Sequence, residues 1–172
     1  MRITYGIAVA AALALSACGG GGEAPKAEDK APEKMADGLY EVTSEVIDLS
    51  STDKTTPATK LKKGDTQVVK ACVANGKPAP DMFAEAGDKC ETKNDYVRYG
   101  RLSAQLSCKR GSLSGEVMPA MMGSYTADGF EGDISTLTYF VKDGDYRMLR
   151  KVTGKRIGDC PVALNTGEEL NQ

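Results

Sequence analysis

The chain has 172 residues, a length typical of one domain. Its 22 basic and 24 acidic side chains nearly balance, so the protein lacks the positive field that binds a phosphate backbone, and we expect no nucleic-acid partner. The sequence contains no histidine, which excludes the Ser-His-Asp and Cys-His catalytic arrangements and every metal site that needs a histidine ligand.

Residues 1–17 are typical of a bacterial signal peptide. Arg2 supplies a positive charge, and residues 7–15 (IAVAAALAL) form an apolar run too short for a bilayer, which needs about 20 residues. Residues 15–18 (LSAC) follow, and they resemble the lipobox of bacterial lipoproteins. This resemblance implies cleavage before Cys18, which then carries a diacylglycerol and an amide-linked acyl chain such as palmitate. An ordinary secretory signal with a coincidental cysteine is the alternative.

The lipobox implies a lipid anchor in the cell envelope of a Gram-negative bacterium, with the membrane as a partner. Three acyl chains on Cys18 would hold the protein permanently, because one chain alone binds only reversibly. Gly19, rather than Asp, follows this cysteine. By resemblance to sorted lipoproteins, we therefore expect the periplasmic face of the outer membrane.

Residues 19–37 contain mainly Gly, Ala, Pro, Glu and Lys with almost nothing apolar, a composition that predicts a disordered linker. The sequence therefore divides into a signal peptide (1–17), an acylated N-terminus and linker (18–37), a β-rich periplasmic domain (38–162) and a polar C-terminal tail (163–172).

The β-rich domain begins with two strands. Residues 39–48 alternate apolar and polar side chains, as a half-buried strand does, and residues 66–73 form the second strand after a polar loop. Asp81 and Gly87 then suit the two ends of a short helix over 81–86.

Hairpins fill the rest of the domain. A pairing centred on Tyr99 joins strands over 90–97 and 101–108, and Asp128-Gly129 and Asp143-Gly144 are typical two-residue turns. Around the last turn, Tyr139 pairs with Met148, and one face of the hairpin collects most of the large apolar side chains. The side chains expected on that packed face are Leu137, Tyr139, Val141, Tyr146, Met148 and Val152.

This alternation predicts a mostly β fold with one packed and one solvated face. About seven strands in antiparallel meander order would form a curved sheet, a sandwich or a partly open barrel, with the single short helix near 81–86.

Four cysteines remain after Cys18. The hairpin register sets Cys90 opposite Cys108 at a distance that a disulfide can bridge, which leaves Cys72 to pair with Cys160. A four-cysteine zinc site is the alternative, but its usual two close cysteine pairs are missing. We therefore expect two disulfides.

Two segments resemble a known family. Residues 38–42 (GLYEV) resemble the Gly-Leu-Trp-Glu-Val opening of the bacterial domain of unknown function numbered 3617 (DUF3617), and residues 153–161 (TGKRIGDCP) resemble its closing segment. Tyr40 stands where the family more often has Trp. The positions of Cys72, Cys90 and Cys108 also fit the family's layout. The resemblance implies a small exported β-rich domain with disulfides and no assigned activity.

Two side-chain clusters are candidate metal sites. Met118, Met121 and Met122 offer soft ligands for Cu(I), although methionines also fill irregular core space. Three carboxylates form a second cluster that lacks the spacing of a calcium loop. These are Asp128, Glu131 and Asp133. We assign neither cluster, and expect no metal and no cofactor.

No segment of the sequence indicates catalysis, since residues 111–115 (GSLSG) lack the G-x-S-x-G order. We predict a non-enzymatic, membrane-anchored envelope lipoprotein that contacts envelope proteins. The alternative is a module that binds an apolar small molecule or lipid in the concave face of its sheet. A filled interior would favour the first function, and a tyrosine-lined cavity the second. The tyrosines concerned are Tyr40, Tyr96, Tyr139 and Tyr146.

Overall fold

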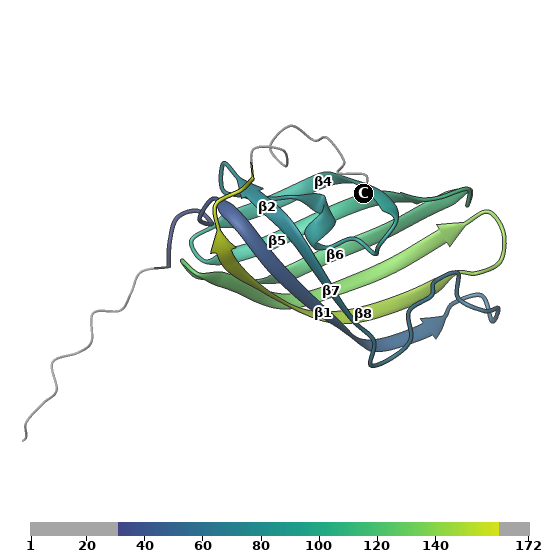
Figure 1. The fold of residues 1–172 in the computed structure, drawn as a ribbon. Coiled ribbons are helices and arrows are strands. Elements are labelled where there is room, and N and C mark those ends of the chain that lie inside the picture. Colours follow the sequence, from purple (N-terminus) through teal and green to yellow (C-terminus); the bar gives the residue numbers. More distant parts are fainter. Residues whose placement is uncertain (1–30, 162–172) are drawn as a thin grey trace, which may run out of the picture.

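A computed structural model describes residues 31–161, so Cys18, the signal peptide and the tail after residue 162 lie outside the described residues. Eight strands form one antiparallel sheet with the order β3-β2-β1-β8-β7-β6-β5-β4. The sheet curls into a nearly closed barrel, which confirms the mostly β fold (Figure 1). The strands are β1 (Gly38–Ser51), β2 (Thr66–Ala74), β3 (Lys77–Pro78), β4 (Asp88–Arg98), β5 (Arg101–Arg110), β6 (Gly115–Tyr125), β7 (Gly129–Phe140) and β8 (Tyr146–Gly158).

The barrel is closed by strands from the two ends of the domain. Strands β4 to β8 follow one another as a meander, and β1 then pairs with β8 on one side and β2 on the other. The seam that remains lies between β2–β3 and β4. Met35, Met82 and Phe83 are buried under it, and Lys77 on β3 pairs with Asp95 on β4 at 3.1 Å. No helix within residues 31–161 has the length and apolarity needed to span a membrane.

Side chains fill the interior of the barrel, because alternate residues of the long strands point inward. The Phe130 ring packs edge-on against Phe83, with 5.9 Å between ring centroids, and lies 6.2 Å from the Tyr40 ring. Gly154 on the neighbouring strand leaves the space that this ring occupies, since any side chain there would overlap it. These aromatic side chains belong to the main core, whereas a second, smaller one consists of Val46, Tyr146 and Met148.

The prediction of a helix over residues 81–86 is wrong. A short 3₁₀ helix, η1 (Pro80–Met82), occupies this place, and Asp81 does not cap it because the N-cap residue is Ala79. Four consecutive residues after Asp81 are buried, which a one-sided helix on the surface would not allow. The segment lies over the seam of the barrel, and burial there outweighs the local helix signals.

The hairpin between β4 and β5 differs from the expected register near its turn. Tyr99 and Gly100 form a two-residue turn, with φ of 51° and 76°, so Val97 pairs with Leu102. The expected pairing, centred on Tyr99, set Tyr96 opposite Leu102 and is wrong by one residue.

A β-bulge at Lys93 restores the expected pairing further along this hairpin. The register shifts by one residue between Thr92 and Asn94, and Cys90 therefore lies opposite Cys108. The two Cα atoms are 4.0 Å apart and the cysteines are bonded. The second expected pair, Cys72 and Cys160, is also bonded, with 5.9 Å between Cα atoms, and links β2 to the chain just after β8.

The hairpin between β7 and β8 does not follow the expected register either. Thr136, rather than Tyr139, pairs with Met148, so the threonines of β7 face inward. Leu137, Tyr139 and Val141 are instead 40%, 58% and 79% exposed. The expected packed face is therefore wrong for β7, although Tyr146, Met148 and Val152 on β8 are buried as expected.

Two carboxylates explain the wider turn. Asp145 accepts hydrogen bonds from the Phe140 amide at 2.8 Å and the Thr138 hydroxyl at 3.0 Å, which holds the chain in a five-residue loop. Asp53, from the β1–β2 loop, accepts from the amides of Gly144 and Asp145. Hydrogen bonds from Thr55 hold the pKa of Asp53 well below its ordinary value. These hydrogen bonds stabilise the five-residue loop in place of a two-residue turn at Asp143-Gly144.

Removal of the disulfides should destabilise the domain by different amounts. The sequence separations are 88 for Cys72 and Cys160 and 18 for Cys90 and Cys108. By the chain-entropy estimate, replacing both cysteines by Ala should lower the free energy of unfolding by about 4.6 kcal/mol for the first pair and about 3 kcal/mol for the second. Urea unfolding checks these losses, and peptide mapping without reduction checks the pairs. A peptide that links Cys72 to Cys90 would contradict the fold.

Candidate functional site

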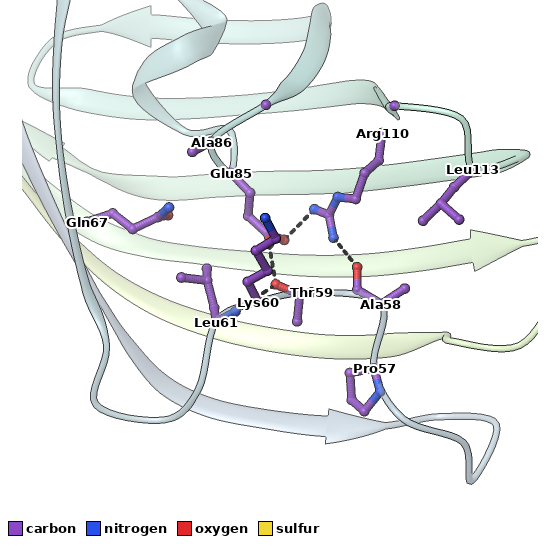
Figure 2. A pocket seen from close by; sticks show the side chains of 12 residues that line it. Pro57, Ala58, Thr59, Lys60, Leu61, Gln67, Glu85, Ala86, Arg110 and Leu113 are labelled. Atoms are coloured by element: carbon purple, nitrogen blue, oxygen red, sulfur yellow. Dashed lines mark hydrogen bonds and ion pairs between the residues drawn. The ribbon is translucent and has the colours of Figure 1, made fainter.

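A cleft of about 650 Å³ opens at one end of the barrel (Figure 2). Its walls come from residues 57–61 of the β1–β2 loop, residues 85–87 before β4, and residues 110–113 at the β5–β6 turn. The chain enters the barrel at the opposite end, where Glu33 accepts a hydrogen bond from the Tyr99 amide at 3.3 Å. The cleft therefore lies at the end remote from the N-terminal segment.

Arg110 forms the centre of a buried polar group beside this cleft. Its Nε and Nη2 atoms donate to the two carboxylate oxygens of Asp88, each at 2.7 Å, and Nη2 also lies 2.8 Å from Glu85 Oε1. Its Nη1 donates to the Ala58 carbonyl at 2.8 Å and to the Tyr146 hydroxyl at 2.7 Å. All five N–H groups of the guanidinium therefore have partners. Glu85, Asp88, Arg110 and Tyr146 are called the Arg110 cluster below.

Glu85 connects the Arg110 cluster to the loop that covers it. Its carboxylate accepts a short hydrogen bond from the Tyr146 hydroxyl, and a second one from the Thr59 hydroxyl at 2.6 Å. Burial and the negative charge of Glu85 raise the pKa of Tyr146. Burial opposes the charge of Arg110, but its bonds to Asp88 and the charge of Glu85 outweigh this and raise its pKa. The cluster thus joins segments that are distant in sequence.

Arg150 is a second buried arginine, and its environment is different. Its side chain is 1% exposed and donates only to neutral acceptors, among them the carbonyl oxygens of Phe83 and Ala84 and the side chains of Ser44 and Gln67. Three of these contacts are long, at 3.3 to 3.5 Å, and its Nε has no partner in the part of the chain that the structure describes. Within residues 31–161, no carboxylate lies within ion-pair distance of this guanidinium. Burial lowers its pKa.

The four tyrosines whose clustering would favour the ligand-binding alternative do not come together. Tyr40 and Tyr146 are buried in the packed interior, and the Tyr40 hydroxyl donates to the Ala36 carbonyl at 2.9 Å. Tyr96 and Tyr139 are 51% and 58% exposed on the outside. The four tyrosines therefore do not line a common cavity.

The two candidate metal clusters are also not assembled. Met121 is buried in the core, whereas Met122 on the next position of β6 is 70% exposed, so the methionines face opposite sides of the sheet. Among residues 31–161, no three Asp, Glu, Cys or His side chains lie close enough to hold a metal ion.

The four charged residues of the cleft end were not identified from the sequence. Three of them come from two stretches of the chain that only the fold brings together, Glu85 and Asp88 from just before and at the start of β4 and Arg110 from the end of β5. Arg150 carries one available signal, since it has the same phase along β8 as the inward residues Met148 and Val152.

Removal of the Arg110 guanidinium should destabilise the domain, because its carboxylate partners are buried. We expect Arg110→Met to lower the free energy of unfolding by about 3–5 kcal/mol, because Glu85 and Asp88 would stay buried without a counter-charge. The matched control is Lys70→Met, whose exposed pair with Glu41 at 3.7 Å should contribute less than about 1 kcal/mol. Urea unfolding measures both. Adding Glu85→Gln and Asp88→Asn to Arg110→Met should recover part of the loss, and equal losses for Arg110 and Lys70 would contradict the assignment.

The raised pKa of Tyr146 predicts a loss of stability in alkali. In the unfolded chain the phenol ionises near its ordinary pKa of about 10, whereas the folded barrel keeps it protonated. The stabilisation is therefore complete below about pH 10 and decreases as the pH rises further. Urea unfolding between pH 8 and pH 11 should show a steeper alkaline decrease for the wild type than for Tyr146→Phe. Parallel curves would contradict the pKa shift.

Comparison with known proteins supports the sequence resemblance. The family described as protein of unknown function (DUF3617) matches residues 35–160. No curated protein and no solved structure matches the chain. The matched range covers the whole barrel, from Met35 under the seam to Cys160 of the second disulfide. The chain belongs to the DUF3617 family.

Proposed function

We propose that this protein is a non-catalytic lipoprotein of the Gram-negative cell envelope, held on the periplasmic face of the outer membrane by lipidated Cys18 and acting through contacts with envelope proteins. The observation that supports a contact role is the filled barrel. Phe83, Phe130 and Met121 occupy the interior, where an apolar ligand in the concave face would have to lie. This favours the contact role over an apolar ligand in the concave face of the sheet.

The polar side chains of the cleft end support a non-catalytic role. General acid–base catalysis needs a group that can take up or release a proton near neutral pH. In the Arg110 cluster, the carboxylates are paired with the guanidinium and the phenol of Tyr146 has a raised pKa. Although Glu85 and Arg110 line the cleft, the charged and phenolic groups of the cluster are engaged with one another.

The outer surface offers apolar side chains for contacts. Leu137, Tyr139 and Val141 follow one another at alternate positions, and all three are exposed. Apolar side chains grouped on a surface commonly mark interaction sites. This stripe runs along β7 to the end of the barrel that is remote from the N-terminal segment.

The N-terminal segment supports an orientation relative to the membrane. Met35 is buried, and the Tyr125 hydroxyl donates to the carbonyl oxygens of Pro32 and Glu33 at 3.0 and 2.9 Å. A chain anchored at Cys18 therefore reaches the barrel at this end, and the cleft end is directed away from the membrane. The two disulfides suit the oxidising periplasm.

Two substitutions at the lipobox test the anchor. We expect Cys18→Ser to abolish incorporation of labelled palmitate and to move the protein from the membrane fraction to the soluble fraction, since the acylated thiol is lost. The matched control is Gly19→Asp, which should keep acylation but move the protein from the outer to the inner membrane fraction. Membrane fractionation with palmitate labelling measures both. Full membrane retention and labelling of Cys18→Ser would contradict the proposal.

A further inference from the structure

We propose that the cleft at the end of the barrel binds a small amphipathic anion, an apolar chain with a carboxylate or phosphate head group, and that this head group replaces Gln67 as the partner of Arg150. The proposal goes beyond the anchored contact role, because it assigns a ligand to the end of the barrel that is directed away from the membrane.

The first argument is the contrast between the two buried arginines. Arg110 has two carboxylate partners, and all its donors are used. Among the described residues 31–161, Arg150 has only neutral acceptors and its Nε has no partner. Glu85 and Asp88 act on Arg150 only from beyond ion-pair distance, and a direct bond to an anion would remove much of the cost of burying this charge. Arg150 is therefore the group that an incoming anion would stabilise most.

The second argument is access through Gln67. This half-buried residue lines the cleft, and its Oε1 accepts a hydrogen bond from Arg150 Nη1 at 3.3 Å. In Figure 2 its side chain extends from β2 toward the space between Leu61 and Glu85. A carboxylate or phosphate oxygen offers the same acceptor with a full charge, which gives a shorter and stronger hydrogen bond. Rotation of this one flexible side chain would open the path to the guanidinium.

The charge of the cleft favours an anion over a cation. Glu85 and Asp88 carry two negative charges, which the positive charges of Arg110 and Arg150 balance. Lys60 lines the cleft as an exposed side chain and adds a further positive charge. The local sum is therefore positive, and the head group of an anion would gain from both Lys60 and Arg150.

The walls of the cleft favour an apolar chain behind that head group. Pro57, Ala58, Leu61 and Leu113 line the cleft, and Leu113 is 40% exposed. The volume of about 650 Å³ lies within the range of small-molecule sites, which is about 300–1,000 Å³. Because the interior beyond is filled, the chain of the ligand would lie along these walls and not inside the barrel.

Isothermal titration calorimetry with four ligands of equal chain length tests the proposal. The mature chain, residues 18–172 with Cys18→Ser, is suitable, because without the apolar signal peptide and the acyl chains it needs no detergent, which would compete for the cleft. We expect decanoate or decyl phosphate to bind with one-to-one stoichiometry, and decanol and decyltrimethylammonium to bind at least about tenfold more weakly. The tighter of the two anions identifies the head group. The absence of saturable binding by both anions, or equal binding of decanol, would overturn the proposal.

Variants locate the site. Arg150→Met keeps the volume of the side chain and should weaken binding of the anion by about tenfold or more while leaving that of decanol unchanged. Lys60→Glu and Leu113→Asp change exposed residues without disturbing the core, and each should weaken anion binding, so the test does not depend on Arg150→Met folding. The matched control is Lys70→Glu on the outside of β2, which should bind like the parent chain. Anion binding that none of the cleft variants weakens would place the ligand elsewhere and overturn the proposal.

The outcome is independent of the anchor. Calorimetry measures ligand binding at the cleft, and fractionation measures membrane anchoring through Cys18. A negative result for the ligand site therefore does not contradict the lipid anchor, and a negative result for the anchor does not contradict the ligand site.

Discussion

A single guanidinium holds together the end of the barrel where its longest loops meet. Arg110 lies at the end of β5, yet its partners come from three other parts of the chain. Ala58 lies in the β1–β2 loop, Glu85 and Asp88 lie just before and at the start of β4, and Tyr146 begins β8. Because both carboxylates are buried, each member of the group depends on the others for its solvation. The polar β1–β2 loop, which has no apolar pattern of its own, takes a fixed place because its backbone and the Thr59 hydroxyl complete this set of bonds.

Closure of the barrel uses two kinds of contact. Strand β1 is hydrogen-bonded on both sides, whereas the edges of β2 and β4 face a seam that backbone pairing does not close. Apolar side chains from η1 and from the N-terminal segment fill that seam, and the bond between Cys72 and Cys160 fixes β2 to the end of β8. An interior filled from the side in this way leaves little room for a ligand in the concave face. Recognition is thereby directed to the outer surface and to the open end of the barrel.

Features that depend on neighbouring residues could be predicted from the sequence. The alternation over 39–48 predicts a strand. The turn near Tyr99 predicts that Cys90 lies opposite Cys108, which is correct because the bulge at Lys93 cancels the one-residue offset of the predicted register near the turn. Features that depend on distant partners could not. The turn between β7 and β8 depends on hydrogen bonds that its amides donate to Asp53, some 90 residues earlier, and the faces of Leu137 and Tyr139 are the reverse of those expected. For the same reason, no local pattern in the sequence indicates the Arg110 cluster.

Arg150 is the residue that the folding of the barrel explains least. Its neighbours of the same phase on β8 are Tyr146, Met148 and Val152, and each contributes apolar surface to the interior. A methionine of similar volume would pack there without the cost of a buried charge, and replacements of buried charges by apolar residues are often neutral or stabilising. The guanidinium receives only neutral partners in return, three of them at 3.3 to 3.5 Å, and one of these three, Gln67, borders the open cleft. A charge retained at such a position, next to an entrance, is better accounted for by an anion that the barrel binds than by the stability of the barrel itself.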